Sequence, residues 1–499
     1  MKIHGFKTNI FWLLCFFACA GQMACKKLIA IDEPINTLTT TEIFSTDATA
    51  TSAMAGVYST MINGTNGGLA VNSYGSEFSA GSTTLLGSLS SDDIYFFTAV
   101  SNSVPDVFGT NHLTAQNAGA SSAVWNSAYS AIYKSNSVIE GIAASKSAAL
   151  HDNVRTELTA EAKFIRAFCY FYLTNFFGDV PMALTVDFNQ TANQPRMPQQ
   201  QVYQQIIADL KDAQASLAAD YSAGSGERII PNKWAATLLL ARVYLYAGSY
   251  ADAATQATSI INNNALFGLE TDLGNVFSTT SREAVWQLKQ TSTDPNLKNA
   301  TPEGIMFGVT TTDHHGYPQY CLTDQLLAAF EPGDRRRTVW VDSTDHPNYP
   351  PAGMAYVPHK YIIDAANADA GQPVPQYYMV LRMAEAYLIR AEANADNPTG
   401  DAAASVADLN VIRTRAGLSN LDAGLSGQAL KHAVARERQV EFFAEWGHRW
   451  FDLKRTGQAH AVLSVIPMKQ QWAGDYQLLY PIPQTEITVD HFLKQNPGY

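Results

Sequence analysis

The chain has 499 residues, of which 46% are hydrophobic and 16% are charged, a balance typical of a globular protein and not of a disordered one. Its formal net charge is −12 and no long basic run occurs. Nucleic acids and anionic membrane surfaces are therefore excluded as main partners, because phosphate binding needs clustered Lys and Arg. The length allows one large domain or two to three of ordinary size.

The first 24 residues are expected to be an export signal. Lys2 and Lys7 precede an apolar run, 10–20, that is too short to cross a bilayer. Ala24 then precedes Cys25, an arrangement that resembles a bacterial lipoprotein cleavage site, so Cys25 is the expected lipidation site. Ordinary secretory cleavage is the alternative. Residues 25–45 are expected to form a lipid-anchored tether and an extended start.

Cysteine usage excludes a disulfide framework. Cys15 and Cys19 leave with the signal, Cys25 takes the lipid, and only Cys169 and Cys321 remain. Neither belongs to a CxxC pair that would bind a metal. Stability must therefore come from a large hydrophobic core.

The first half of the chain alternates between irregular and helical patterns. Residues 47–62 have apolar side chains at helical spacing, with Thr46 or Asp47 as the N-cap. A long stretch rich in Gly, Ser, Thr and Asn follows at 63–120 and is expected to be irregular. Helical periodicity then returns in three segments: from 121, at 157–176 and at 199–217.

Two stretches are predicted to be helical hairpins. The first spans 233–263 with a break at Gly248, and the second joins 377–395 to 401–415. Alanines at fixed points let paired helices pack closely, much as in tetratricopeptide repeats. Between them, residues 264–376 have several prolines and short strand-like runs such as 284–288, which predicts loops and small β-elements.

A helix is predicted from 427 to 446. Glu437, Glu441 and Glu445 are four residues apart, and Arg438 lies three before Glu441. This spacing places opposite charges side by side on one helical face, where aromatic neighbours would leave them half-buried and paired.

The same segment carries a family resemblance. Residues 436–442 read R-x-R-x-x-E-F, residues 449–453 read R-W-F-D-L, and the chain closes with Pro481-Ile482-Pro483 and Gln495-Asn496-Pro497-Gly498-Tyr499. This combination resembles the C-terminal signature of the SusD/RagB family of surface lipoproteins.

The resemblance implies a mostly α-helical fold, in which four tetratricopeptide-like helical pairs form a scaffold with long irregular loops and a few short β-elements. It implies one domain over 46–499, with an N-terminal part at 46–263 and a C-terminal part at 264–499. It also implies a lipoprotein at the outer-membrane surface that binds oligosaccharides or polysaccharide fragments. Such a protein delivers them to a SusC-like TonB-dependent transporter.

Catalytic motifs are absent from the sequence, so we expect no enzyme activity. HExxH, GxSxG and Walker A patterns do not occur. The neighbouring acids Asp92 and Asp93 give no evidence of a glycosidase dyad, which needs two carboxyl groups facing each other about 5–10 Å apart. No cofactor or metal site is predicted; a structural calcium ion would suit the acidic pair, but the regular Asp-x-Asp-x-Asp spacing is missing.

Aromatic residues in the irregular segments are the expected ligand contacts, because aromatic faces stack on sugar CH groups while nearby acids bind hydroxyls. The predicted contacts are Asp92, Tyr95, Phe96, Trp340 and Tyr349. Three alternatives stay open: oligopeptide cargo as in RagB-like proteins, a surface-anchored glycoside hydrolase, and a lipoprotein with a purely structural role.

Overall fold

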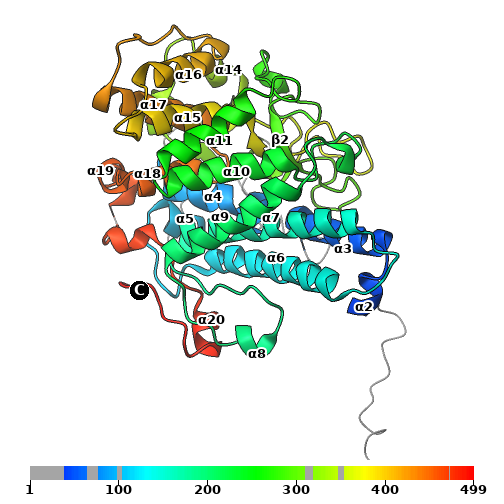
Figure 1. Cartoon of the computed structure of the whole chain (residues 1–499). Coiled ribbons are helices and arrows are strands. Elements are labelled where there is room, and N and C mark those ends of the chain that lie inside the picture. The colour runs from blue at the N-terminus through cyan, green and yellow to red at the C-terminus, as the bar shows by residue number, and fades with distance from the viewer. Residues whose placement is uncertain (1–38, 65–76, 98–103, 310–317, 347–352, 471) are drawn as a thin grey trace, which may run out of the picture.

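The computed structural model describes residues 39–64, 77–97, 104–309, 318–346, 353–470 and 472–499. Most of the structure is helical, and Figure 1 shows the long helices stacked side by side. The helices of eight or more residues are α3 (Asp47–Asn63), α4 (Thr83–Ser90), α6 (Gly119–Ala144), α7 (Asp152–Phe177), α9 (Gln199–Ser216), α10 (Lys233–Tyr246), α11 (Tyr250–Ile261), α15 (Met383–Asp396), α16 (Ala402–Arg415), α17 (Gly427–Phe442) and α18 (His448–Arg455). No helix in the described ranges has the length and apolar character needed to cross a bilayer.

Shorter helices connect the long ones. They are α2 (Thr40–Ile43), α5 (Val104–Gly109), α8 (Phe188–Thr191), α12 (Pro302–Phe307), α13 (Asp324–Ala329), α14 (Arg335–Val339), α19 (Ala459–Leu463) and α20 (Gln484–Val489). Within the described residues the strands are β1 (Ile94–Phe96), β2 (Ala284–Leu288), β3 (Tyr320–Leu322), β4 (Val341–His346), β5 (Gly353–Pro358) and β6 (Tyr378–Arg382). They form three two-stranded antiparallel sheets, β1 with β3, β2 with β6 and β4 with β5.

The helical stack follows chain order: α6 packs on α7, α7 on α9, α9 on α10, α10 on α11 and α11 on α15. Both predicted hairpins are confirmed, as α10 with α11 and α15 with α16. In α11 the small side chains of Ala253 and Ala257 are fully buried, which allows the close helix approach that the sequence predicted. The second hairpin starts later than predicted, because residues 378–382 form strand β6 before α15 begins at Met383.

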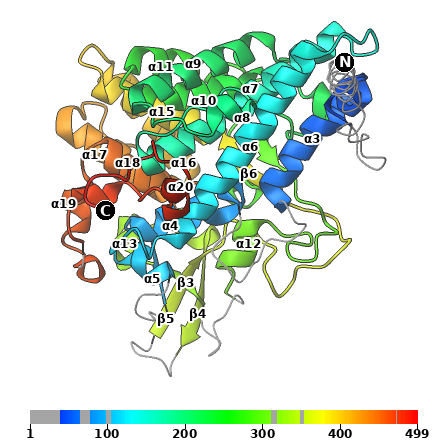
Figure 2. The ribbon, with the colours of Figure 1, turned by 90° about the horizontal axis from the view of Figure 1, so that it is seen from below.

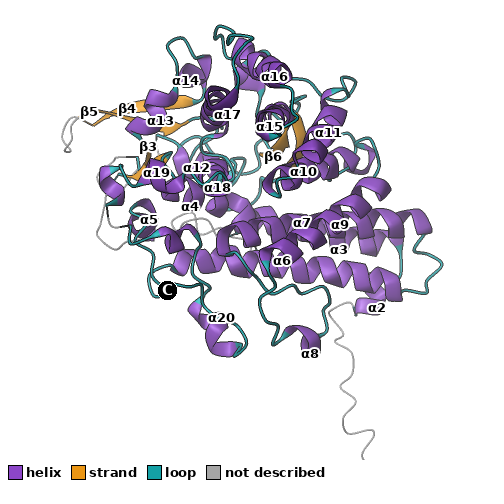
Figure 3. Cartoon of the chain, turned by 60° about the vertical axis from the view of Figure 1, so that its left-hand side comes forward, coloured by secondary structure: helices purple, strands orange, loops and turns teal. Residues whose placement is uncertain are grey.

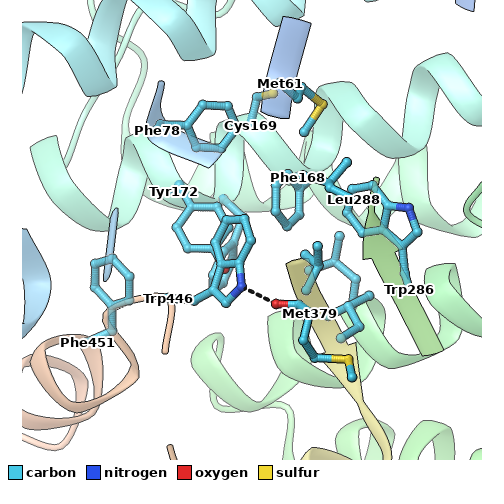
Figure 4. Close-up of a cluster of buried hydrophobic side chains, with 14 of the residues drawn as sticks. Met61, Phe78, Phe168, Cys169, Tyr172, Trp286, Leu288, Met379, Trp446 and Phe451 are labelled. Carbon is cyan, nitrogen blue, oxygen red and sulfur yellow. Dashed lines mark hydrogen bonds between the residues drawn. The ribbon is translucent and has the colours of Figure 1, made fainter. Parts of the chain in front are cut away.

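An aromatic cluster holds the centre of the molecule together. The ring of Phe168 in α7 contacts Trp446 edge-on, with ring centroids 5.5 Å apart. The ring of Tyr172, one turn further along α7, contacts Trp446 in a tilted arrangement at 5.4 Å. The indole nitrogen of Trp446 donates to the carbonyl of Met379 at 2.7 Å, so the buried polar atom is satisfied (Figure 4). Helix α7 is buried on all sides in its second half, where every residue from Phe164 onwards is buried. Arg166 is the charged residue of this half, and Asp209 pairs with it at 2.7 Å.

The region 63–120 contains a buried helix that the sequence analysis missed. All eight residues of α4 are buried, four of them Ser or Thr, so the helix has no exposed face and its sequence lacks the alternation of apolar and exposed polar residues that marks a surface helix. Helix α4 crosses the start of α18 at two glycines: a Cβ added to Gly87 would lie 2.6 Å from the Cα of Gly447. Gly447 also has a φ of 68°, a conformation that favours glycine. The prediction of an irregular 63–120 segment is corrected here.

The predicted helix 427–446 ends early. Helix α17 stops at Phe442, and a turn in which Ala444 and Trp446 have φ values of 50° and 47° leads into α18. The expected charge pairing is wrong as well. Arg438 pairs with Asp452 at 2.7 Å and with Glu392 at 3.3 Å, and not with Glu441.

Candidate functional site

Asp92 and Asp93 lie in the short connection between α4 and β1, and both are buried. The side chain of Asp92 accepts two hydrogen bonds from Arg449, from Nε at 2.7 Å and from Nη2 at 2.8 Å. Burial, and then the charge of Asp92, raise the pKa of Asp93 to about 8. Asp92 is 3% exposed and Asp93 1%, so neither carboxyl group is presented to a substrate as a glycosidase dyad would require.

Trp340 is also buried, at 1% exposed. Its indole Nε1 donates to the carbonyl of Leu273 at 3.0 Å, and the Nζ of Lys360 lies 4.9 Å from the ring centroid. The burial of Asp92 and of Trp340 corrects the expectation that these two side chains contact ligand. Both instead support the fold beneath the surface, where an unpaired charge or indole N–H would be costly.

Behind Trp340 lies a buried ion-pair network centred on Glu441. Its carboxylate accepts from Arg336 at 2.9 Å and from Arg382 at 2.5 Å, and it also binds Arg415. Burial alone would raise the pKa of Glu441, but Arg415, Arg382 and Arg336 together hold it well below its usual value. The acidic row of α17 is thus fully enclosed, not half-buried, and its partners come from α14, β6 and α16.

Glu445 joins the same network from the turn after α17. It accepts from Lys360 at 2.5 Å and from Arg382 Nε at 2.9 Å. Burial lowers the pKa of Lys360 to about 8, although Glu445 opposes this. The network is tied into the turn, since Lys360 also donates to the carbonyls of Glu441 and Phe443.

Strands β1, β3, β4 and β5 form a separate unit, which we call the strand platform. Figure 2 shows β3, β4 and β5 side by side at one end of the molecule, away from α9, α10 and α11. Figure 3 shows the same strands grouped apart from β6, which lies among the helices. Strand β3 pairs with β1 and lies against β5, so the strand platform joins residues 94–96 to the distant stretch 320–358.

A small hydrophobic cluster holds the strand platform together. Phe97, Cys321, Ala355 and Val357 are its buried members, and Tyr95 packs against them. Tyr95 and Phe96 are both half-buried, each with part of its ring at the surface. Burial raises the pKa of the Tyr95 phenol, so the ring is neutral at physiological pH.

A third half-buried ring on the strand platform is Tyr356 of β5. The guanidinium of Arg337 lies 4.2 Å from the centre of its ring, a cation–π contact between α14 and β5. Phe96 pairs with Tyr320 of β3 at a ring-centroid distance of 5.6 Å. The tertiary structure therefore places Tyr95, Phe96 and Tyr356, which are 261 positions apart at their extremes, on one unit. Tyr95 and Phe96 are successive residues of β1, so their rings point to opposite faces of that strand.

Tyr349 and Cys25 lie outside the described residues, so ligand contact at the former and lipidation at the latter remain predictions. Among the residues that the structure does describe, no group of three or more His, Cys, Asp or Glu side chains is placed to hold a metal ion.

Two family models match this chain in separate halves. The model described as "SusD family" matches residues 329–499, and the one described as "Starch-binding associating with outer membrane" matches residues 72–245. Together they cover more than half of the sequence.

Full-length relatives are similar in sequence as well. SusD-like protein P2 of Formosa agariphila is 27% identical over 420 residues, which are 76% of this chain and 81% of that protein. A SusD-like protein of Bacteroides ovatus is 24% identical over 382 residues, which are 69% of this chain and 67% of the relative.

Solved structures share the fold. A SusD superfamily protein from Bacteroides vulgatus aligns with a TM-score of 0.75 at 19% identity, covering 91% of this chain and 100% of the other. A laminarin-binding SusD-like protein aligns with a TM-score of 0.71 at 22% identity, with the same coverage. With the helical stack, the C-terminal motifs and both family models in agreement, the chain belongs to the SusD/RagB family.

Proposed function

We propose that this protein captures oligosaccharides on the strand platform at the surface of the outer membrane. The observation that carries the proposal is that one unit built from four strands holds three half-buried rings, Tyr95 on one face of β1, Phe96 on the other and Tyr356 on β5. The name of one structural neighbour, a laminarin-binding protein, and the description of one matching family model, starch-binding, support a glucan as the ligand.

The physical basis is stacking on rings that are already held in place. Phe96 is positioned by Tyr320, Tyr356 by Arg337, and Tyr95 by the cluster around Cys321. A ring fixed before binding loses little rotamer entropy when a sugar stacks on it, so more of the contact energy becomes affinity.

Delivery to a transporter is the second half of the proposal. A lipid on Cys25 would keep the protein at the membrane, and a SusC-like TonB-dependent transporter would take up the captured glycan. Anchoring raises the local concentration of the binder at the transporter and converts the second encounter into a nearly intramolecular one.

Isothermal titration calorimetry tests the capture step. Laminarin oligosaccharides and malto-oligosaccharides should bind, and Tyr95→Ala should weaken binding by about tenfold, or about 1.4 kcal/mol. Tyr133→Ala is the matched control, because Tyr133 is an exposed tyrosine (58%) on α6, outside the strand platform. Equal affinity of the Tyr95→Ala and Tyr133→Ala variants for the glycan would refute the platform as the binding site. If the protein binds oligopeptides and no glycan, its ligand is a peptide and the glycan proposal is wrong.

Membrane fractionation and co-purification test anchoring and delivery. Cys25→Ala should move the protein from the membrane to the soluble fraction, with Cys321→Ala as a cysteine control that keeps the lipid. A SusC-like transporter should co-purify with the wild-type protein from detergent-solubilised outer membranes. Retention of the Cys25→Ala variant in the membrane would contradict lipid anchoring at this residue.

A further inference from the structure

A cleft of about 790 Å³ lies between the α10–α11 turn, α15, α17 and α18. Figure 1 shows α17 and α18 beside α15, at the end of the α10 and α11 pair. The volume lies within the range of about 300–1,000 Å³ that is usual for small-molecule sites. The cleft shares no residue with the strand platform.

One wall of the cleft offers a hydrogen-bond donor next to an acceptor. Arg449 and Gln439 both line the cleft, and both are held from behind by the buried carboxylate of Asp92. Asp92 engages Arg449 through Nε and Nη2 and Gln439 through Nε2, the last at 3.3 Å. Asp93 is a further partner of the Gln439 side chain. In the described part of the chain, the hydrogen bonds of these two side chains to Asp92 use neither Nη1 of Arg449 nor Oε1 of Gln439.

The side chains of Gln439 and Arg449 are held in position before a ligand binds. Gln439 is only 9% exposed and the side chain of Arg449 only 12%, so both hold fixed positions and present one end to the cleft. A planar amide and a planar guanidinium anchored on one carboxylate can bind two neighbouring hydroxyl groups, one as acceptor and one as donor.

The charges that line the cleft are largely cancelled. Lys431 pairs with Asp396 at 2.7 Å, Arg455 with Glu392 at 2.7 Å, and Arg438 with Asp452 at 2.7 Å. Because Arg449 is neutralised by Asp92 in the same way, the cleft offers no buried excess of either sign to attract an ion. This balance favours a neutral ligand rich in hydroxyl groups.

The α10–α11 turn adds apolar and aromatic side chains to the lining. Leu245, Tyr246 and Tyr250 line the cleft there, and both tyrosines are half-buried. The guanidinium of Arg455 covers the Tyr246 ring at 4.8 Å, so Tyr250 is the ring that remains for a sugar. An apolar wall facing a few convergent polar groups is the usual composition of a small-molecule site, and aromatic rings suit the CH faces of a sugar.

We propose that this cleft is a second binding site, for a neutral mono- or disaccharide, with Gln439 and Arg449 binding its hydroxyls. It lies apart from the strand platform and would bind a short sugar independently of the longer glycan proposed there. The site does not depend on the platform proposal, since its polar wall is anchored by Asp92 and not by the platform rings.

Saturation-transfer NMR with glucose, mannose, galactose, maltose and cellobiose tests the site on the full mature protein. At least one of these sugars should receive saturation from the wild-type protein. Ala435→Trp should reduce that signal at least fivefold, because Ala435 is exposed and lines the cleft, so a bulky side chain fills the space without removing a contact. Ala403→Trp, on exposed α16 surface outside the cleft, is the matched control and should leave the signal unchanged.

The platform variant separates the two sites. Tyr95→Ala should leave the transfer to the short sugar intact, whereas it weakens long-glycan binding in calorimetry. No transfer to any of the five sugars, or equal transfer to the Ala435→Trp and Ala403→Trp proteins, would overturn the second site. Loss of the signal in Tyr95→Ala would also overturn it, by assigning the sugar to the platform. Thermal melting of each variant shows that the protein compared is folded.

Discussion

Arg449 and Asp92 form a two-point ion pair across 357 residues of sequence. The guanidinium Nε and Nη2 donate to the two carboxylate oxygens at 2.7 Å and 2.8 Å. Asp92 ends the turn after α4, two residues before β1, and Arg449 is the second residue of α18. This contact fixes the C-terminal helices to the segment that leads into the strand platform.

Removal of Arg449 should destabilise the protein. Arg449→Ala leaves Asp92 buried without its partner, so the free energy of unfolding should fall by about 3 kcal/mol or more. Urea denaturation measures this change. Arg436→Ala is the control: its side chain is 47% exposed and its nearest acid is 3.8 Å away, so a loss below about 1 kcal/mol is expected. Equal stabilities for the two variants would contradict the structural role of the Arg449–Asp92 pair.

Glu441 should be among the least replaceable acids in the chain. Glu441→Gln removes the charge that faces Arg336, Arg382 and Arg415 in a fully buried position. Leaving these cations without their shared partner should cost about 3–5 kcal/mol. Glu227→Gln, which breaks a pair with Lys289 whose side chains are about 40% exposed, should cost less than about 1 kcal/mol. Thermal melting of both variants gives the comparison, and a mild effect at Glu441 would mean that water reaches the network.

The Gly87–Gly447 crossing predicts a strong effect from one methyl group. Gly87→Ala places a Cβ 2.6 Å from the Cα of Gly447, where the backbone of α18 would have to move. We expect a loss of about 2 kcal/mol or more from overpacking. Gly56→Ala is the control on exposed α3, where a Cβ meets nothing within 4 Å; it should stabilise by up to about 1 kcal/mol because alanine favours the helix. Opposite signs for these two identical substitutions, measured by chemical denaturation, are the expected outcome.

Glu161 should make stability depend on pH. Burial raises its pKa from 4.5 to about 8, and the hydrogen bond from the Tyr58 hydroxyl at 2.5 Å only partly opposes this. The folded state then binds more protons than the unfolded state between these values, so the contribution of Glu161 is full below about pH 4.5 and falls as pH rises to about 8. At 1.36 kcal/mol per pKa unit this loss is at most about 5 kcal/mol.

Glu161→Gln removes that titration. As pH rises from about 5 to about 8, the wild-type protein should therefore lose stability relative to the Glu161→Gln variant, as measured by the free energy of unfolding of each. Asp212→Asn is the control, because its side chain is 60% exposed and its partner, Lys163, is a lysine, so its difference from wild type should stay nearly constant over this range. Parallel pH profiles for all three proteins would show that Glu161 is ionised in the fold.

Local pattern predicted the helical stack well. The α10–α11 and α15–α16 hairpins were predicted from the spacing of alanines and aromatic residues. A helix that buries one face has apolar residues three and four positions apart, and this period is visible in the sequence. Strand β2 was likewise predicted at its observed bounds, 284–288. The periodicity of apolar residues did not predict α4, because that helix is buried on every side. It also placed the end of α17 too late, because a turn with positive φ values follows Phe442 in place of a last helical turn.

Ligand contacts were harder to predict than helices. An aromatic ring in an irregular segment has the same sequence signal whether it lies at the surface, as Tyr95 partly does, or inside, as Trp340 does. Asp92 was predicted as a ligand contact because aromatic residues follow it in the sequence, but its role was decided by Arg449, which no local spacing connects to it. Tyr356 became part of the site only because β5 lies against β3.

The amino-acid sequence alone determined the helical class, the two hairpins and the family motifs, since these depend on interactions within about twenty residues. The tertiary structure decided which acids form ion pairs with which arginines and which aromatic rings are partly exposed. It also decided that Gln439 and Arg449 both bind the carboxylate of Asp92. Those outcomes depend on contacts between segments hundreds of residues apart, and burial, which sets the energy of each charge, exists only once the chain has folded.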